Sequence, residues 1–143
     1  MGRILAIDYG TKRTGIAVSD PLRIIATALT TVPTHELRPF LQKYIADNDV
    51  DTIVVGMPRR MNGQPSETWA QIEPLAKWLE RELPDRRVVM HDERFTSVLA
   101  QRAMIDGGMK KMARRDRSTV DRVSAVIILQ GYMESLDYKK NTL

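Results

Sequence analysis

ILAIDYGTKRTGIAVSD, residues 4–20, is the stretch of sequence that constrains the fold most strongly. Two short apolar runs flank a segment of glycines, threonines and cations, and this pattern predicts a β-hairpin. One acid, Asp8, closes the first apolar run. A carboxylate in a core strand costs roughly several kcal/mol unless a hydrogen bond or a cation compensates it. Asp8 is therefore the first candidate for a functional residue.

The rest of the chain predicts further strands reached through helices. Three strands with short connections, at the N-terminal end, predict an antiparallel meander, and the later strands add to it across helices. We expect an α/β fold in one domain, residues 1–143, with a mixed sheet covered by helices, and Thr34 as the N-cap of the first helix. The expected strands are 3–9, 15–19, 24–32, 51–56 and 86–91, and the expected helices are 35–48, 66–82, 96–106 and 119–136.

Composition places the chain among globular proteins. Its 143 residues are 43% hydrophobic and 28% charged, which is typical of a single domain with one core. The chain has no cysteine, which excludes disulfides and thiolate metal sites. No apolar stretch approaches the roughly 18–20 residues that span a bilayer. We expect a cytoplasmic protein with no membrane association.

Positive charge is concentrated in one segment. Residues 110–122, KKMARRDRSTVDR, hold six of the 22 Lys and Arg and two of the 18 Asp and Glu, so the rest of the chain is neutral. Such a patch is typical of a surface that binds a polyanion, commonly a nucleic acid, although a solvated basic loop has the same composition. The segment 107–118 lacks apolar periodicity, and we expect it to be a mobile basic clamp.

Acids at three places suggest a metal site. Asp8 ends the first strand, Asp92 and Glu93 follow the last strand, and Asp121 lies in the first turn of the apolar last helix. Oxygen ligands suit Mg²⁺ or Mn²⁺, and two such ions roughly 3.5–4 Å apart hydrolyse phosphodiesters. Each acid also has a structural explanation, as a turn, a solvated pair or a helix N-terminus. The pattern alone does not choose between Asp92 and Glu93.

Four segments, in order, resemble the signature blocks of a known family. The segments are IDYGTKRTGIAVSD (7–20), VVGMPRRMNG (54–63), HDERFTS (91–97) and VDRVSAVIILQGYM (120–133). They are similar to the YqgF family, the Holliday junction resolvases or pre-16S rRNA nucleases of bacteria. One departure is Ser124, which stands where the family usually has alanine.

The resemblance implies a ribonuclease H-like fold, with a five-stranded mixed sheet of three antiparallel then two parallel strands flanked by α-helices. It implies that Asp8, Glu93 and Asp121 hold two divalent metal ions, which favours Glu93 over Asp92. Lys12 and Arg13 match the family's cation pair and would reach a phosphate. Further candidates for nucleic-acid binding are Arg59, Arg60, Arg94, Lys110, Lys111, Arg114 and Arg115. Asp20 also matches a family position, without an assigned role.

The function that follows is a Mg²⁺- or Mn²⁺-dependent endonuclease, processing the 5′ end of pre-16S rRNA in ribosome biogenesis. The first alternative is a Holliday junction resolvase in DNA recombination and repair. Two others come from different classes: a non-catalytic nucleic-acid-binding module, and an actin-like ATPase-type phosphate binder, to which the DYGT turn at 8–11 is also suited. The sequence shows no clear exposed apolar face, so we expect a monomer, or a dimer if the chain resolves junctions.

Overall fold

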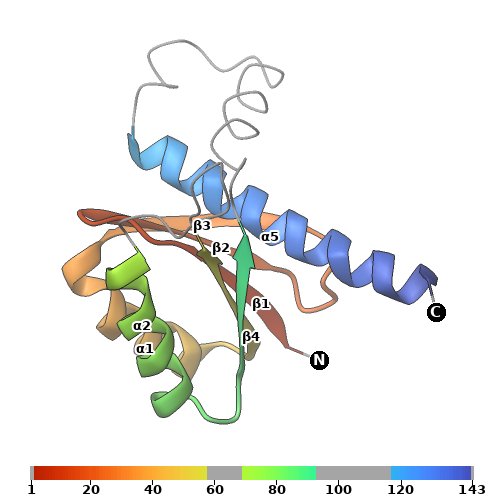
Figure 1. Cartoon of the computed structure of the whole chain (residues 1–143), viewed down its shortest axis with the longest axis horizontal. Helices are drawn as coiled ribbons and strands as arrows, with labels where there is room; N and C mark the ends of the chain where they lie inside the picture. The colour runs from red at the N-terminus through yellow and green to blue at the C-terminus, as the bar shows by residue number, and fades with distance from the viewer. Residues whose placement is uncertain (1, 58–68, 93–116, 143) are drawn as a thin grey trace.

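The computed structural model describes residues 2–57, 69–92 and 117–142, and Figure 1 shows their arrangement. Five strands and three α-helices follow one another with a short 3₁₀ turn between β3 and α1. The elements are β1 (Arg3–Asp8), β2 (Arg13–Ser19), β3 (Ala26–Pro33), η1 (Thr34–Glu36), α1 (Leu37–Asp47), β4 (Val50–Met57), α2 (Trp69–Glu82), β5 (Arg87–Asp92) and α5 (Arg117–Thr142). None of the helices in these ranges is long and apolar enough to cross a membrane.

The strands form a single mixed sheet in the order β3-β2-β1-β4-β5. The first three strands pair antiparallel as a meander, and β4 and β5 add parallel to β1. β1 is therefore central, and the carboxyl ends of β1, β4 and β5 meet at one edge of the sheet. The predicted mixed sheet, three antiparallel strands followed by two parallel ones, is confirmed.

Alternation along β1 divides the core into two layers. Leu5 and Ile7 pack into the cluster formed with α1 and α2, and Ile4 and Ala6 pack into the cluster formed with α5. Figure 1 shows α1 and α2 on one face of the sheet and α5 crossing the other. The α5 side is closed by four buried residues of that helix: Ala125, Ile128, Leu129 and Tyr132.

Two expectations about helix ends are wrong. Thr34 does not cap the first helix: it begins the 3₁₀ turn η1, and α1 starts at Leu37 without a side-chain cap. Pro39 then falls in the first turn of α1, where its missing N–H removes no hydrogen bond. The last helix also begins earlier and ends later than expected, at Arg117 and Thr142, because no glycine or proline interrupts residues 132–142.

The predicted helices 66–82 and 96–106 and the segment 107–118 fall partly or wholly outside the described residues. The predicted helix over 66–82 is present from Trp69 to Glu82, and its first three residues lie outside the described residues. The predicted helix 96–106 and the segment 107–116 also lie outside them. Residues 117 and 118, expected to be part of a mobile loop, belong to α5.

Candidate functional site

Asp8 lies at the edge where the parallel strands end. It is the last residue of β1, pairs with Gly15 of β2, and is half-buried. Strand alternation gives Asp8 the same face as Ile4 and Ala6, which is the face covered by α5. The sequence therefore brings this carboxylate to the carboxyl edge of the central strand, under the last helix.

On the α5 face, the residues of β4 and β5 that lie next to Asp8 across the sheet form a row with it. Ile7 pairs with Val55, so Asp8 lies beside Gly56, and Gly56 pairs with His91 of β5. The side chain of His91 faces α5, since a Cβ on Gly131 would lie 3.0 Å from His91 Nε2. Sequence reasoning placed His91 only at a strand end, because nothing local reveals which helix covers it. Gly56 lies between Asp8 and His91 in this row, and as a glycine it has only a hydrogen atom in place of a side chain.

The β1–β2 turn is fixed by Thr34 of η1. The Thr34 hydroxyl donates to the Gly10 carbonyl oxygen at 2.6 Å, and the Thr34 amide donates to the Lys12 carbonyl oxygen at 2.9 Å. The Thr34 hydroxyl oxygen is 3.0 Å from the Thr14 hydroxyl oxygen, and because the single Thr34 proton is already used, Thr14 is the donor. Thr34 thus binds the hairpin, which explains why it is not a helix cap.

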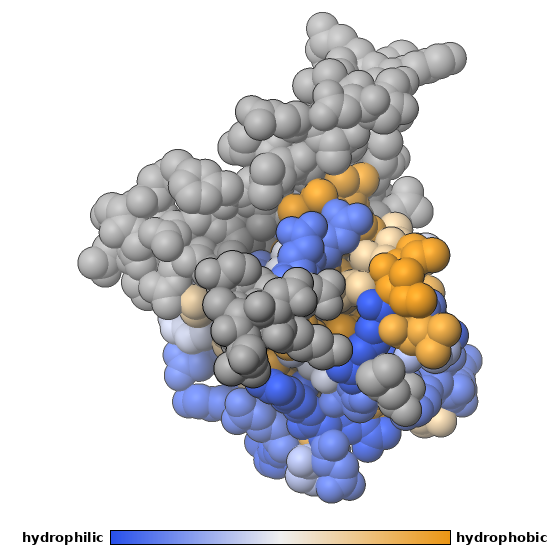
Figure 2. Space-filling view, turned by 90° about the vertical axis from the view of Figure 1, so that its right-hand side faces the viewer, coloured by the Kyte–Doolittle hydropathy of each residue, from blue (hydrophilic) through white to orange (hydrophobic). Residues whose placement is uncertain are grey.

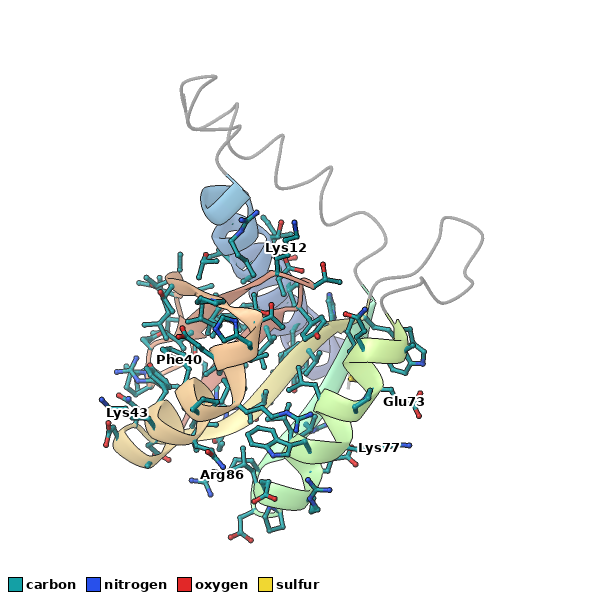
Figure 3. All side chains as sticks on the ribbon, turned by 90° about the vertical axis from the view of Figure 1, so that its left-hand side faces the viewer. Lys12, Phe40, Lys43, Glu73, Lys77 and Arg86 are labelled. Carbon is teal, nitrogen blue, oxygen red and sulfur yellow. The ribbon has the colours of Figure 1, made fainter. Side chains whose placement is uncertain are left out.

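Gly10 is required by the geometry of the same turn. A Cβ at this position would lie 2.2 Å from the Arg13 carbonyl oxygen, a backbone atom that cannot move without opening the hairpin. The turn presents Lys12 to solvent, and Figure 3 shows Lys12 at the end of the sheet where α5 begins. Arg13 is half-buried and, two residues before Gly15, belongs to the face of Asp8. Arg13 therefore shares the face of the acid, and Lys12 lies exposed on the turn that precedes Arg13.

The other candidate residues are described only in part. Asp92 is the last residue of β5, in register with Met57, and Asp121 is the fifth residue of α5. Among the side chains that the structure describes, which include neither Asp92 nor Asp121, there is no group of three or more His, Asp or Glu that could hold a metal ion. The remaining candidates lie outside the described ranges: Arg59, Arg60, Glu93, Arg94, Lys110, Lys111, Arg114 and Arg115.

The chemistry of the donor set fits a hard divalent cation. The proposed ligands are carboxylates, Asp8 is at a strand end rather than in the closed core, and the chain has no thiol. Mg²⁺ and Mn²⁺ take oxygen ligands of this kind and keep water in the remaining positions. The cations Lys12 and Arg13 can hold phosphate oxygens next to such an ion.

The opposite end of the sheet shows the role of Asp20, which had no assigned role in the sequence motif. Asp20 follows β2, and its Oδ1 accepts the amides of Ile24 and Ile25, both at 2.7 Å. Its Oδ2 accepts the Leu22 amide at 3.2 Å. The amide of Ile25 contributes most to lowering the pKa of Asp20 below its ordinary value of 3.8, with burial partly opposing it. Asp20 is an anchor for the β2–β3 turn.

Arg23 binds this turn to the body of the protein. Its guanidinium forms an ion pair with Asp51 and donates to the Gly2 carbonyl oxygen at 3.0 Å. Burial raises the pKa of Asp51, but the Gly2 amide, the Thr52 hydroxyl and Arg23 together outweigh it and lower that pKa. Arg23 itself has a φ of 59°, the left-handed region that non-glycine residues seldom adopt. The turn is therefore rigid and specifically built.

Three large apolar side chains project from this turn. Leu22, Ile24 and Ile25 are 67%, 69% and 62% exposed, the large hydrophobic side chains found exposed among the described residues. Figure 2 shows a compact hydrophobic area with hydrophilic surroundings on this side of the molecule. The premise of the monomer prediction, that no apolar face is exposed, is therefore wrong, because Ile24 and Ile25 precede the strand they were expected to join.

Comparison with known proteins identifies a close set of relatives. Residues 2–135 match the family model described as RuvX, Holliday junction resolvase. A protein of Phocaeicola vulgatus named "Putative pre-16S rRNA nuclease" is 55% identical over 138 residues, 96% of this chain and 99% of the relative. A protein of the same name from Bacteroides fragilis is 53% identical over 94% of this chain and 98% of its own length.

One solved structure shares the fold over nearly the whole length. RuvC from T. thermophilus, in complex with a Holliday junction substrate, has a TM-score of 0.56 and 14% sequence identity. The match covers 93% of this chain and 96% of RuvC. This likeness confirms the ribonuclease H-like fold that the sequence resemblance implied.

Proposed function

This chain belongs to the RuvX family, the YqgF family of the sequence resemblance, and on that premise we propose that it is a Mg²⁺- or Mn²⁺-dependent endonuclease that processes the 5′ end of pre-16S rRNA. Membership makes it an enzyme of the nuclease class acting on nucleic acid. The names of the relatives support an RNA substrate. On the same basis we propose a single nuclease domain that works in the cytoplasm.

The observation that carries the proposal is the placement of Asp8. Its carboxylate stands at the carboxyl edge of the central strand, half-buried, on the face covered by α5. Asp121 is four residues before Ala125 of α5, a residue buried on that same face, and this spacing supports its approach to Asp8. Glu93 follows directly on β5, the strand whose His91 side chain faces α5. We propose these three acids as the catalytic ligands.

A bound pair of divalent ions would supply an activated water and stabilise the leaving oxygen of the phosphodiester. The chain's own residues would prepare that site. Asp8, Glu93 and Asp121 would hold the cations, which offset the repulsion between the three carboxylates. Lys12 and Arg13, on the turn fixed by Thr34, would bind the phosphate next to the cleaved bond.

The basic residues outside the described ranges would extend this contact along the nucleic acid. We propose that Lys110, Lys111, Arg114 and Arg115 contact phosphates, and that Arg59, Arg60 and Arg94 add further contacts. The support for the first four is the charge distribution, since the whole excess of positive charge falls in residues 110–122, whereas Arg59, Arg60 and Arg94 are supported by their places in the segments that resemble the family. Such contacts add affinity without reading the base sequence.

A Holliday junction resolvase is the second candidate. The description of the family model supports it, whereas the names of the relatives support RNA processing. Two paired cuts across a four-way junction require two active sites, so this alternative needs a dimer that faces both sites toward one junction.

The test is cleavage of both substrates by the purified chain. RNA carrying the 5′ extension of 16S rRNA and a four-way DNA junction are incubated with and without Mg²⁺ or Mn²⁺. We expect the RNA to be cleaved only when the metal is present. The cleavage rate should fall more than about 100-fold in Asp8→Asn, because losing a metal ligand costs more than the 10–100-fold typical of losing a residue that only supports a ligand. Asp47→Asn, at an exposed aspartate of α1, is the matched control. Undiminished cleavage by Asp8→Asn refutes the assigned role.

A further inference from the structure

A groove runs between the β2–β3 turn and the C-terminal half of α5. Its volume is about 630 Å³. It lies at the end of the sheet opposite Asp8, because Ser19, the last residue of β2, is bonded to Arg3 and Ile4 at the start of β1. The lining residues are Arg23, Ile24, Ile25, Ala26, Gln130, Met133 and Glu134.

The turn beside the groove forms an apolar ledge, defined as Leu22, Ile24 and Ile25. These side chains are more than three-fifths exposed although the backbone that carries them is held by the Asp20 carboxylate and by Arg23. Flexible loops can fold apolar side chains back against the surface, but this turn is fixed with them pointing outward. Thr27 and Ala28 of the edge strand β3 continue the uncharged surface. A rigid, exposed apolar surface of this kind marks a protein interaction site.

The ledge and the groove share residues, and this identifies the occupant. A two-fold axis through such a patch places the ledge of each copy against the groove of the other, as an isologous interface requires. A different protein would need only one of the two features. Charge agrees, because Arg23 remains 24% exposed while it is paired with Asp51, and the exposed Glu134 lies across the groove on α5. In the two-fold arrangement, each Arg23 approaches the Glu134 of the other copy.

We propose that a second copy of this chain binds here, with Ile24 and Ile25 of each protomer in the groove of its partner. Nucleic acid does not fit this patch, which exposes three large apolar side chains and carries Glu134. The cation of the patch, Arg23, is already paired with Asp51, while the excess positive charge falls in residues 110–122. The interface would leave the edge that carries Asp8 open in both protomers, facing away from each other. This inference is independent of the substrate proposed above.

Sedimentation equilibrium of the full chain over a wide range of protein concentrations tests the proposal. We expect a reversible dimer for the wild type, and a dissociation constant at least about tenfold higher for Ile24→Glu, which places a charge in an apolar contact. Gln42→Glu, at an exposed position of α1, adds the same charge elsewhere and serves as the matched control. Thermal melts followed by circular dichroism verify that each variant is folded.

A second variant tests the seating of the ledge in the groove. Gln130 lines the groove from α5, so Ile24→Glu combined with Gln130→Lys places opposite charges across the interface and should restore the dimer. A wild type that is monomeric at all concentrations overturns the proposal, as does a dimer that Ile24→Glu leaves intact. A dimer that Ile24→Glu breaks and Gln130→Lys does not restore also overturns it, because the ledge then contacts another surface, such as the edge of β3.

Discussion

Asp8 and Asp20 mark the two ends of one hairpin, and each follows a strand directly. Asp20 is enclosed by its own turn, where three backbone amides donate to its carboxylate and lower its pKa. Asp8 lies instead at the edge where three strands end on the α5 face, beside Gly56 and on the same face as Arg13. One acid stabilises a turn, and the other is available to a site assembled from distant elements.

The difference shows that an acid at the end of a strand does not by itself indicate a functional site. The residue type and the local pattern are the same at both positions, so the pattern cannot distinguish an anchor from a ligand. What differs is the following segment: the chain after Asp20 folds back so that its amides reach the carboxylate. The chain after Asp8 is instead bound by Thr34, whose hydroxyl donates to the Gly10 carbonyl oxygen and whose amide donates to the Lys12 carbonyl oxygen.

The largest effect on stability is expected at Gly10, on the Asp8 side of this comparison. In Gly10→Ala, the new Cβ would lie 2.2 Å from a backbone oxygen, so the hairpin must open. We expect a loss of about 1–3 kcal/mol in the free energy of unfolding, measured by urea denaturation. Nuclease activity should fall further than stability alone explains, because Lys12 and Arg13 move with the turn.

Gly131→Ala is the matched control for this prediction. Its Cβ would lie 3.0 Å from Nε2 of His91, the end of a side chain that can rotate away. The substitution also gains up to about 1 kcal/mol of helix propensity, so its stability should change little. Equal losses in the two variants would contradict the special role of the Gly10 turn.

A smaller effect is expected at low pH, on the Asp20 side. The folded pKa values of Asp20 and Asp51 are lowered from 3.8. Their contribution to stability is therefore complete above pH 3.8 and is lost as the pH falls through the lower folded values. Asp51→Asn should cost about 1 kcal/mol at pH 7, since the pair with Arg23 is partly exposed. Urea denaturation at pH 7 and pH 3 should show a smaller loss on acidification in the variant than in the wild type. An equal loss would contradict the assignment.

Much of the fold was predictable from local pattern. The apolar runs predicted the five strands and a mixed sheet built on a meander, and the resemblance implied three antiparallel strands followed by two parallel ones, which the structure has. Asp8 could be selected because an acid in an apolar run is costly unless it is compensated, whereas Lys12 and Arg13 were selected by the resemblance to a known family. Helix ends were less predictable: Thr34 has the residue type of a cap, but its hydroxyl binds the hairpin 24 residues away.

The ledge and the row on the α5 face could not be predicted. Ile24 and Ile25 have the composition of a strand, and only the bonds from their amides to Asp20 show that the turn includes them. His91 gains its place from Gly131, 40 residues later in the chain, through close contact of β5 with α5. Both depend on tertiary contacts that leave no periodic signal in the sequence.

Measuring Mn²⁺ binding in variants of the two acids tests the central claim most directly. The claim is that Asp8 is a metal ligand, whereas Asp20 anchors the β2–β3 turn. Melting temperatures are measured against Mn²⁺ concentration for the wild type, Asp8→Asn and Asp20→Asn. Mn²⁺ at about 100 times its dissociation constant stabilises a protein by roughly 2.7 kcal/mol. We predict that this stabilisation is present in the wild type and in Asp20→Asn, from a lower starting stability, and requires at least about tenfold more Mn²⁺ in Asp8→Asn. An Mn²⁺ response in Asp8→Asn equal to that of the wild type would contradict the account.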